Sequence, residues 1–92
     1  MIERPVVIMN RLGLHARAAA LLVRAANTFQ SVIRLERVDG TAAADAKSIL
    51  SVLMLAASFG TELRATAEGV DEEQAISIVC GLFENGFGEN EE

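Results

Sequence analysis

Hydrophobic and polar residues alternate with two different periods along this chain. In residues 32–38 the apolar Ile33 and Leu35 alternate with charged residues, and in 61–68 Leu63, Ala65 and Ala67 alternate with polar ones. This is the pattern of a strand with one buried face and one solvent-exposed face. The apolar run at 6–9, directly after Pro5, predicts an earlier strand. Helical spacing predicts a helix that begins at Ala16 and buries an apolar stripe, namely Ala19, Leu22, Val23, Ala26 and Phe29.

Turn residues and a cap divide the middle of the chain. Asp39-Gly40 is typical of a hairpin turn, so we expect a weak strand over 41–44 to return beside the 32–38 strand. Ser48 is a suitable N-cap for a second helical segment, which we expect to end at Phe59-Gly60. Apolar residues surround this segment almost completely. Some of them should therefore be exposed, as is typical of a partner-binding surface.

A third helix is predicted from Glu72 to about Phe83, burying Ala75, Val79 and Leu82. Asp71, with Gln74 three residues later, resembles a capping box at its start. Val70 is placed to pack on Ala75 as a hydrophobic staple.

The predicted element order is β-α-β-β-α-β-α, with a hairpin in the middle. This order favours an α+β sandwich, in which helices cover one face of an antiparallel or mixed sheet. We expect a single domain over 1–84. Residues 85–92 are rich in Gly, Asn and Glu and predict an acidic, flexible C-terminal tail.

Composition narrows the function. The 92 residues suffice for one domain, and 51% are hydrophobic with no Trp or Tyr, so the core must be mainly aliphatic. All eight Lys and Arg lie in residues 1–64, and residues 65–92 hold eight acids and no base. Without a basic cluster or a stacking platform, nucleic acid is a poor partner. No apolar run is long enough to span a membrane.

Cysteine and histidine are each present once, as Cys80 and His15. A lone cysteine forms no internal disulfide, and the two residues do not make a usual zinc site. Cys80 is expected to be a small core residue. We therefore expect a protein of the reducing cytoplasm that uses no metal and no other cofactor.

His15 lies at the start of the first predicted helix, between Gly13-Leu14 and Ala16-Arg17. A helix N-terminus offers unpaired N–H groups and partial positive charge, which together bind a phosphoryl group. Arg17 adds a planar fork of donors, and Gly13 allows a close approach of the backbone. This combination favours transient phosphorylation of the histidine over turnover of an organic substrate.

Three motifs then resemble one known family. Gly13-Leu14-His15-Ala16-Arg17-Ala18-Ala19 is similar to the active-site signature of HPr, the histidine-containing phosphocarrier of the bacterial phosphoenolpyruvate:sugar phosphotransferase system. Lys47-Ser48-Ile49-Leu50-Ser51-Val52 resembles that family's regulatory-serine segment, and Ala67-Glu68-Gly69-Val70-Asp71-Glu72 its entry into the last helix. The resemblance covers nearly the whole chain in the same order.

The resemblance implies an open-faced β-sandwich, in which three helices cover one side of a four-stranded antiparallel sheet. It implies that His15 accepts a phosphoryl group on Nδ1 from phosphorylated enzyme I and passes it to EIIA domains. Arg17 then supports the phosphoryl group, while Gly13 and Ala16 belong to the phosphate loop. An apolar docking surface is implied beside the active site, formed by Ile49, Leu50 and Leu53. The family reading favours a monomer.

Ser48 matches the serine that HPr kinase/phosphorylase modifies in many bacteria, although its position alone is explained equally well by a simple N-cap. The chain departs from the family at Ala18, where proline is usual, and over 38–47, which is slightly longer. Two other functions stay open. One is a regulatory paralogue in a nitrogen-type or incomplete phosphotransferase system. The other is a small-molecule-binding or scaffold domain, which would leave residues 13–17 without a role.

Overall fold

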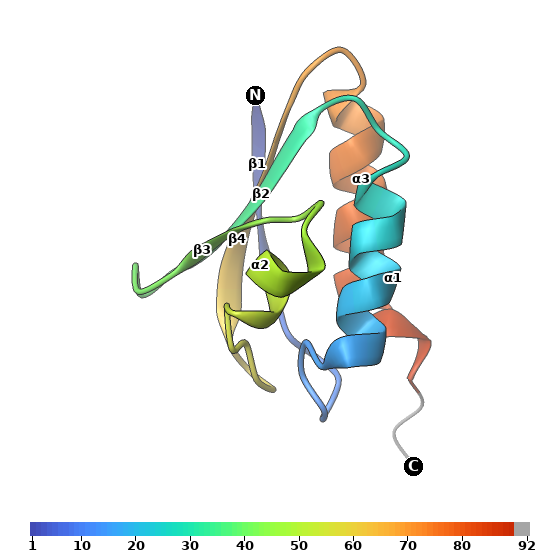
Figure 1. The fold of residues 1–92 in the computed structure, drawn as a ribbon. Coiled ribbons are helices and arrows are strands. Elements are labelled where there is room, and N and C mark those ends of the chain that lie inside the picture. The colour runs from blue at the N-terminus through green and yellow to red at the C-terminus, as the bar shows by residue number, and fades with distance from the viewer. Residues whose placement is uncertain (90–92) are drawn as a thin grey trace.

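The computed structural model describes residues 1–89 of the chain. Its elements are, in order, β1 (Ile2–Val7), α1 (Ala16–Ala26), β2 (Val32–Arg37), β3 (Ala43–Asp45), α2 (Ile49–Leu53), β4 (Glu62–Glu68), α3 (Glu72–Glu84) and the 3-10 helix η1 (Gly86–Gly88). The four strands form one antiparallel sheet in the order β1-β4-β2-β3. In Figure 1, α1 and α3 run side by side in opposite directions over one face of this sheet. The predicted fold class is confirmed.

The core lies between the sheet and the helices and is almost entirely aliphatic. β4 shows how sequence period becomes packing, since Leu63, Ala65 and Ala67 are fully buried and alternate with wetter residues. In the stripe predicted for α1, Ala19, Leu22 and Ala26 have zero exposure, as expected. Val23 is only partly buried, and Phe29 lies beyond the end of the helix and is partly buried too. Cys80 is buried on α3, as expected for a small core residue.

The apolar run at 6–9 predicted a strand that begins after Pro5. β1 begins at Ile2 instead and includes Pro5. Within the described residues β1 pairs only with β4, where Pro5 lies opposite Arg64. An edge strand has one unpaired side, so a residue without an N–H is accommodated there. The expectation that the strand follows Pro5 was therefore wrong.

The second helical segment is shorter than expected. Ser48 caps it as predicted, its Oγ accepting from the backbone N of Ser51 at 3.3 Å, but α2 ends at Leu53 rather than near Gly60. The chain turns at Ala56, which has a φ of +52°. Arg37 from β2 holds this turn, donating to the carbonyl oxygens of Leu55 at 3.0 Å and Ala56 at 3.3 Å.

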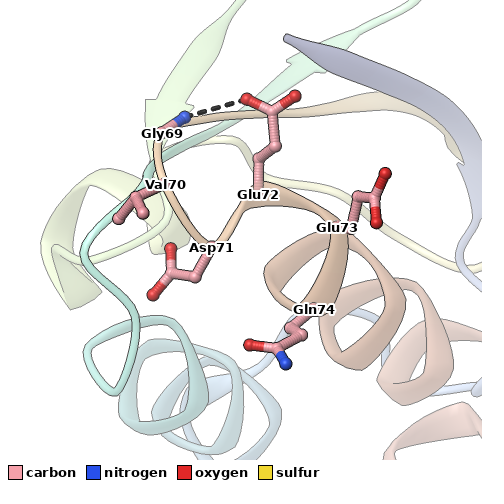
Figure 2. Close-up of a pocket in the computed structure, with 6 residues that line it drawn as sticks. All are labelled: Gly69, Val70, Asp71, Glu72, Glu73 and Gln74. Atoms are coloured by element: carbon pink, nitrogen blue, oxygen red, sulfur yellow. Dashed lines mark hydrogen bonds between the residues drawn. The ribbon is translucent and has the colours of Figure 1, made fainter.

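The start of α3 differs from the predicted capping box. Asp71 makes no side-chain cap bond, and its carboxylate instead accepts the backbone N–H groups of Gln30 and Ser31, at 2.9 and 3.0 Å, and the Ser31 hydroxyl. Glu72 reaches back to the backbone N–H of Gly69 at 3.0 Å, as Figure 2 shows. The predicted staple is wrong as well, because Val70 is 85% exposed.

The last described residues fold back onto the domain, whereas the sequence indicated a solvated tail from residue 85. Gly86 and Phe87 are buried, and the Phe87 ring meets Phe83 of α3 edge-on, with centroids 5.1 Å apart. An aromatic ring three residues past the end of α3 supplies apolar area that this short segment can bury. Residues 90–92 of the expected tail lie outside the described residues.

Candidate functional site: the first turn of α1

His15 is the N-cap of α1. Its backbone is extended, its carbonyl oxygen accepts the first helical bond from Ala19 at 2.8 Å, and its ring Nδ1 accepts the backbone N–H of Arg17 at 3.3 Å. The side chain is 26% exposed, so the ring is accessible to a partner. The sequence prediction placed His15 at this helix start and not inside the helix, and the structure agrees.

The protonation pattern of the ring follows from these partners. A backbone N–H can only donate, so Nδ1 must present its lone pair to Arg17. In a neutral ring the proton is then on Nε2, which faces the carboxylate of Glu89. The nitrogen that holds the free electron pair is therefore the one next to the helix N-terminus, where an anion is stabilised.

Gly13 holds the loop before His15 against the segment after α2. Its φ is +70°, and a Cβ at this position would lie only 2.6 Å from the carbonyl oxygen of Ala57. The same carbonyl accepts the N–H of Leu14 at 2.9 Å. Glycine is thus required here both for the backbone conformation and for the close approach.

Asn10 is a site residue that the sequence analysis did not single out. It is 99% removed from solvent, and its Nδ2 donates to the carbonyl oxygen of Gly13 at 2.8 Å and to Oε1 of Glu89 at 3.0 Å. It therefore joins the loop to the C-terminal segment. The sequence pattern around a single asparagine in a loop does not indicate such contacts.

Glu89 is the second unpredicted residue. Its carboxylate oxygen Oε2 accepts from Nε2 of His15 and from Nη2 of Arg17, the latter at 2.8 Å. The side chain of Glu89 is only 10% exposed, while that of Arg17 is 57% exposed. The hydrogen bond from His15 is the largest influence that holds the pKa of Glu89 below its usual range, and those from Asn10 and Arg17 act in the same direction.

Ser48 and its apolar neighbours form a second surface. Ser48 is half-buried at the start of α2, whereas Ile49, Leu50 and Leu53 are exposed as the sequence predicted. Other large apolar side chains are exposed on the segment that follows α2 and on the loop before His15, namely Met9, Leu12, Met54 and Phe59. The contact between Gly13 and Ala57 brings that loop beside the segment after α2.

Other features of residues 1–89 do not extend the site. The pocket in Figure 2 is lined by residues 69–74 at the turn before α3, at the opposite end of the molecule from the first turn of α1. Its ionisable groups are Asp71, Glu72 and Glu73, an unfavourable lining for a phosphoryl anion. This part of the chain contains no cluster of three or more residues suited to a metal ion. It also holds no helix both long and apolar enough to cross a bilayer.

Comparison with known proteins shows similarity along nearly the whole chain. Phosphocarrier protein HPr of Cupriavidus necator is 43% identical over 91 residues, covering 99% of this chain and 100% of the relative. Phosphocarrier protein NPr of Proteus mirabilis is 44% identical over 87 residues, covering 95% and 96%. The crystal structure of HPr-C-His from Thermoanaerobacter tengcongensis superposes with a TM-score of 0.92 at 42% identity, covering 99% and 100%.

These likenesses define the class as that of small phosphocarrier proteins. The chain belongs to the HPr family. The model of this family, described as PTS HPr component phosphorylation site, matches residues 2–85. The family resemblance carried by the three sequence motifs is thereby confirmed, together with the open-faced sandwich that it implied.

Proposed function

We propose that this protein carries a phosphoryl group on Nδ1 of His15, taken from phosphorylated enzyme I and passed to EIIA domains. The observation that supports this most directly is the hydrogen bond from the backbone N–H of Arg17 to Nδ1. It leaves an unprotonated ring nitrogen at a helix N-terminus, where both the nucleophile and the product dianion are favoured.

Arg17 supplies the mobile charge of the site. Its side chain is more than half exposed, and its guanidinium donates to the carboxylate of Glu89. An incoming phosphoryl group offers it two or three stronger acceptor oxygens in a geometry that suits its planar fork. Gly13 and Ala16 complete the phosphate loop, Gly13 by the close approach described above and Ala16 as the first, exposed residue of the helix.

The protein acts as a carrier and not as an enzyme with its own turnover, and it works as a monomer in the cytoplasm. Enzyme I and the EIIA domains dock on the exposed Ile49, Leu50 and Leu53. This surface is continuous with the loop of His15 through the contact of Gly13 with Ala57, so docking brings a partner's phosphorylated residue toward the ring.

Ser48 is a regulatory position in this proposal, modified by an HPr kinase/phosphorylase. A phosphate at the cap of α2 would be tolerated by the backbone, because negative charge is favourable at a helix start. It would also put a dianion next to Ile49 and Leu50, where it disfavours docking of an apolar or acidic partner surface.

Intact-mass analysis tests the carrier role. The protein is incubated at neutral to mildly basic pH with phosphoenolpyruvate, Mg²⁺ and a bacterial enzyme I, beside His15→Ala and a known HPr. Addition of a single phosphoryl group, absent in His15→Ala, is expected. No addition while the known HPr is phosphorylated in the same mixture would reject the proposal.

The alternative is a regulatory paralogue in a nitrogen-type or incomplete phosphotransferase system. The similarity to an NPr supports this alternative to the same degree as the similarity to an HPr supports the sugar-type carrier. The two roles differ in the acceptor. Phosphorylated protein is offered in parallel to a sugar-type and a nitrogen-type EIIA domain, and transfer to the second alone would favour the paralogue.

A further inference from the structure

The C-terminal segment 85–89 brings one carboxylate into the site. Glu89 receives donors from three separate parts of the loop and helix: Asn10, the ring of His15 and the guanidinium of Arg17. Nothing in the sequence near His15 supplies an acid, so this is the one negatively charged group among the described residues that touches the ring.

The segment is anchored before it reaches the ring. Phe87 is buried against Phe83, and the backbone N–H groups of Gly88 and Glu89 bond to the carbonyl oxygens of Asn85 and Gly86, both at 3.1 Å. Gly86 and Gly88 have positive φ values of +59° and +74°, which allow the chain to reverse direction here. The side chain of Glu89 is thereby delivered to a fixed place at the start of α1.

On this basis, and resting on the proposed carrier function, we propose that Glu89 is a positioning residue for phosphoryl transfer at His15. Its carboxylate holds the proton on Nε2 and fixes the ring, so that Nδ1 keeps its lone pair and faces the helix N-terminus. A carboxylate that orients a reactive imidazole through its other nitrogen is an established way to select one tautomer.

In the proposed transfer one P–N bond forms and one P–N bond breaks. The Nδ1 lone pair attacks the phosphorus of a phosphohistidine on the donor protein, a P–N bond to His15 forms, and the donor's P–N bond breaks with its electron pair returning to the donor ring. The proton on Nε2 stays between Nε2 and Glu89. Positive charge develops on the His15 ring as Nδ1 gives up its lone pair, and the adjacent carboxylate stabilises it.

The two contacts of the Glu89 carboxylate, with His15 and with Arg17, have opposite expected effects on the rate of transfer. Glu89 binds Nε2, on the other side of the ring from Nδ1, so it does not fill the place of the incoming phosphorus. It does share Arg17, which must turn toward the phosphoryl oxygens as they arrive. If holding Arg17 dominated, Glu89 would be an inhibitor, and its removal would accelerate transfer.

The test uses the full chain with two variants and a matched control. Glu89→Ala removes the acceptor, Glu89→Gln keeps an acceptor without the charge, and Glu84→Gln neutralises an exposed carboxylate at the end of α3. The first measurement is the ¹⁵N chemical shifts of the His15 ring in the unphosphorylated protein at neutral pH. We expect the Nε2–H tautomer in the wild type, Glu89→Gln and Glu84→Gln. In Glu89→Ala, of the two contacts described for the ring only the 3.3 Å hydrogen bond from the Arg17 backbone N–H to Nδ1 is left to favour this tautomer, so we expect part of the population to shift to the Nδ1–H form.

The second measurement is the single-turnover rate of phosphoryl transfer from phosphorylated enzyme I. Misorientation of a reacting group costs rate steeply, so Glu89→Ala is expected to be slower by about tenfold or more, with Glu89→Gln between it and the wild type. Glu84→Gln is expected to match the wild type. Faster transfer in Glu89→Ala, or rates and ring shifts equal to those of the wild type, would overturn the positioning role alone. A wild type that accepts no phosphoryl group while a known HPr does would instead remove the carrier function, and this inference with it.

Discussion

The backbone of Gly13 lies against the carbonyl of Ala57, so that a methyl group on Gly13 would come within 2.6 Å of that oxygen. The two residues belong to the loops that flank the site, one before α1 and one after α2. Their contact fixes the position of the His15 loop relative to the exposed apolar residues of α2.

Replacing Gly13 with Ala should therefore destabilise the protein strongly. The left-handed backbone conformation costs about 1 kcal/mol for alanine, and relieving the clash with Ala57 adds about 1–3 kcal/mol. Gly40 provides the matched control, since its φ is +78° but a Cβ there meets nothing within 4 Å. Urea unfolding of Gly13→Ala and Gly40→Ala should show the larger loss in Gly13→Ala, and equal losses would contradict the proposed contact.

The contacts of Asp71 predict that its contribution to the stability of the protein depends on pH. Hydrogen bonds from the Ser31 hydroxyl and the Gln30 backbone lower the pKa of Asp71 below its ordinary value of 3.8. A carboxyl whose folded pKa is depressed contributes stability that is complete above the unfolded pKa and is lost as pH falls through the folded pKa. Asp71→Asn should therefore be less stable than the wild type at neutral pH.

The difference between the two proteins should be constant above about pH 5 and should shrink below pH 3.8, as the wild-type carboxylate is protonated. Chemical denaturation at a series of pH values measures it. A difference that stays constant down to pH 2 would mean that the Asp71 contacts with Gln30 and Ser31 do not depend on its charge.

The contrast between Asp71 and α1 shows what a sequence reveals about this fold. The start of α1, the strand alternation of β4 and the Ser48 cap depend on residues within a few positions of one another, and all three were predicted. Asp71 lies at a plausible cap position, but Ser31, 40 residues away, offers it better donors. A local pattern cannot show that competition.

The site divides in the same way. His15, Gly13 and Arg17 form one short motif at a helix start, so their proximity follows from the sequence. Glu89 reaches His15 across 74 residues, from a segment whose Gly, Asn and Glu content is typical of a solvated tail. Its placement depends on Phe87 finding Phe83, a tertiary contact that no periodicity indicates.

Ala18 occupies the position where the family usually has proline, and the structure predicts that proline is accepted. It is in the first turn of α1, before Ala19, whose N–H makes the first helical bond to His15. Proline at such a position loses no helical hydrogen bond and reduces the freedom of the unfolded chain. Ala18→Pro should therefore raise the free energy of unfolding by about 0.4–1 kcal/mol.

Thermal unfolding of Ala18→Pro measures this change in stability, and Ala20→Pro is the control. Ala20 lies two residues further into α1, where proline removes a helical hydrogen bond and costs about 3 kcal/mol. A lower melting temperature for Ala18→Pro than for the wild type would show that its fully buried side chain leaves no room for the ring.

Two substitutions of Ser48 distinguish its structural role as a helix cap from its proposed regulatory role. Its Oγ caps α2 through Ser51, so Ser48→Ala should lose about 1 kcal/mol of stability. Ser48→Asp keeps an acceptor at the cap and should retain most of the stability, while adding negative charge beside Ile49 and Leu50. Its affinity for enzyme I, measured by calorimetry, should fall, whereas that of Ser48→Ala should stay near the wild-type value. Ser77→Asp adds the same charge on an exposed position of α3 and should bind as the wild type does. If Ser48→Asp also binds as the wild type does, charge at the cap of α2 does not regulate docking, and Ser48 serves only as a cap.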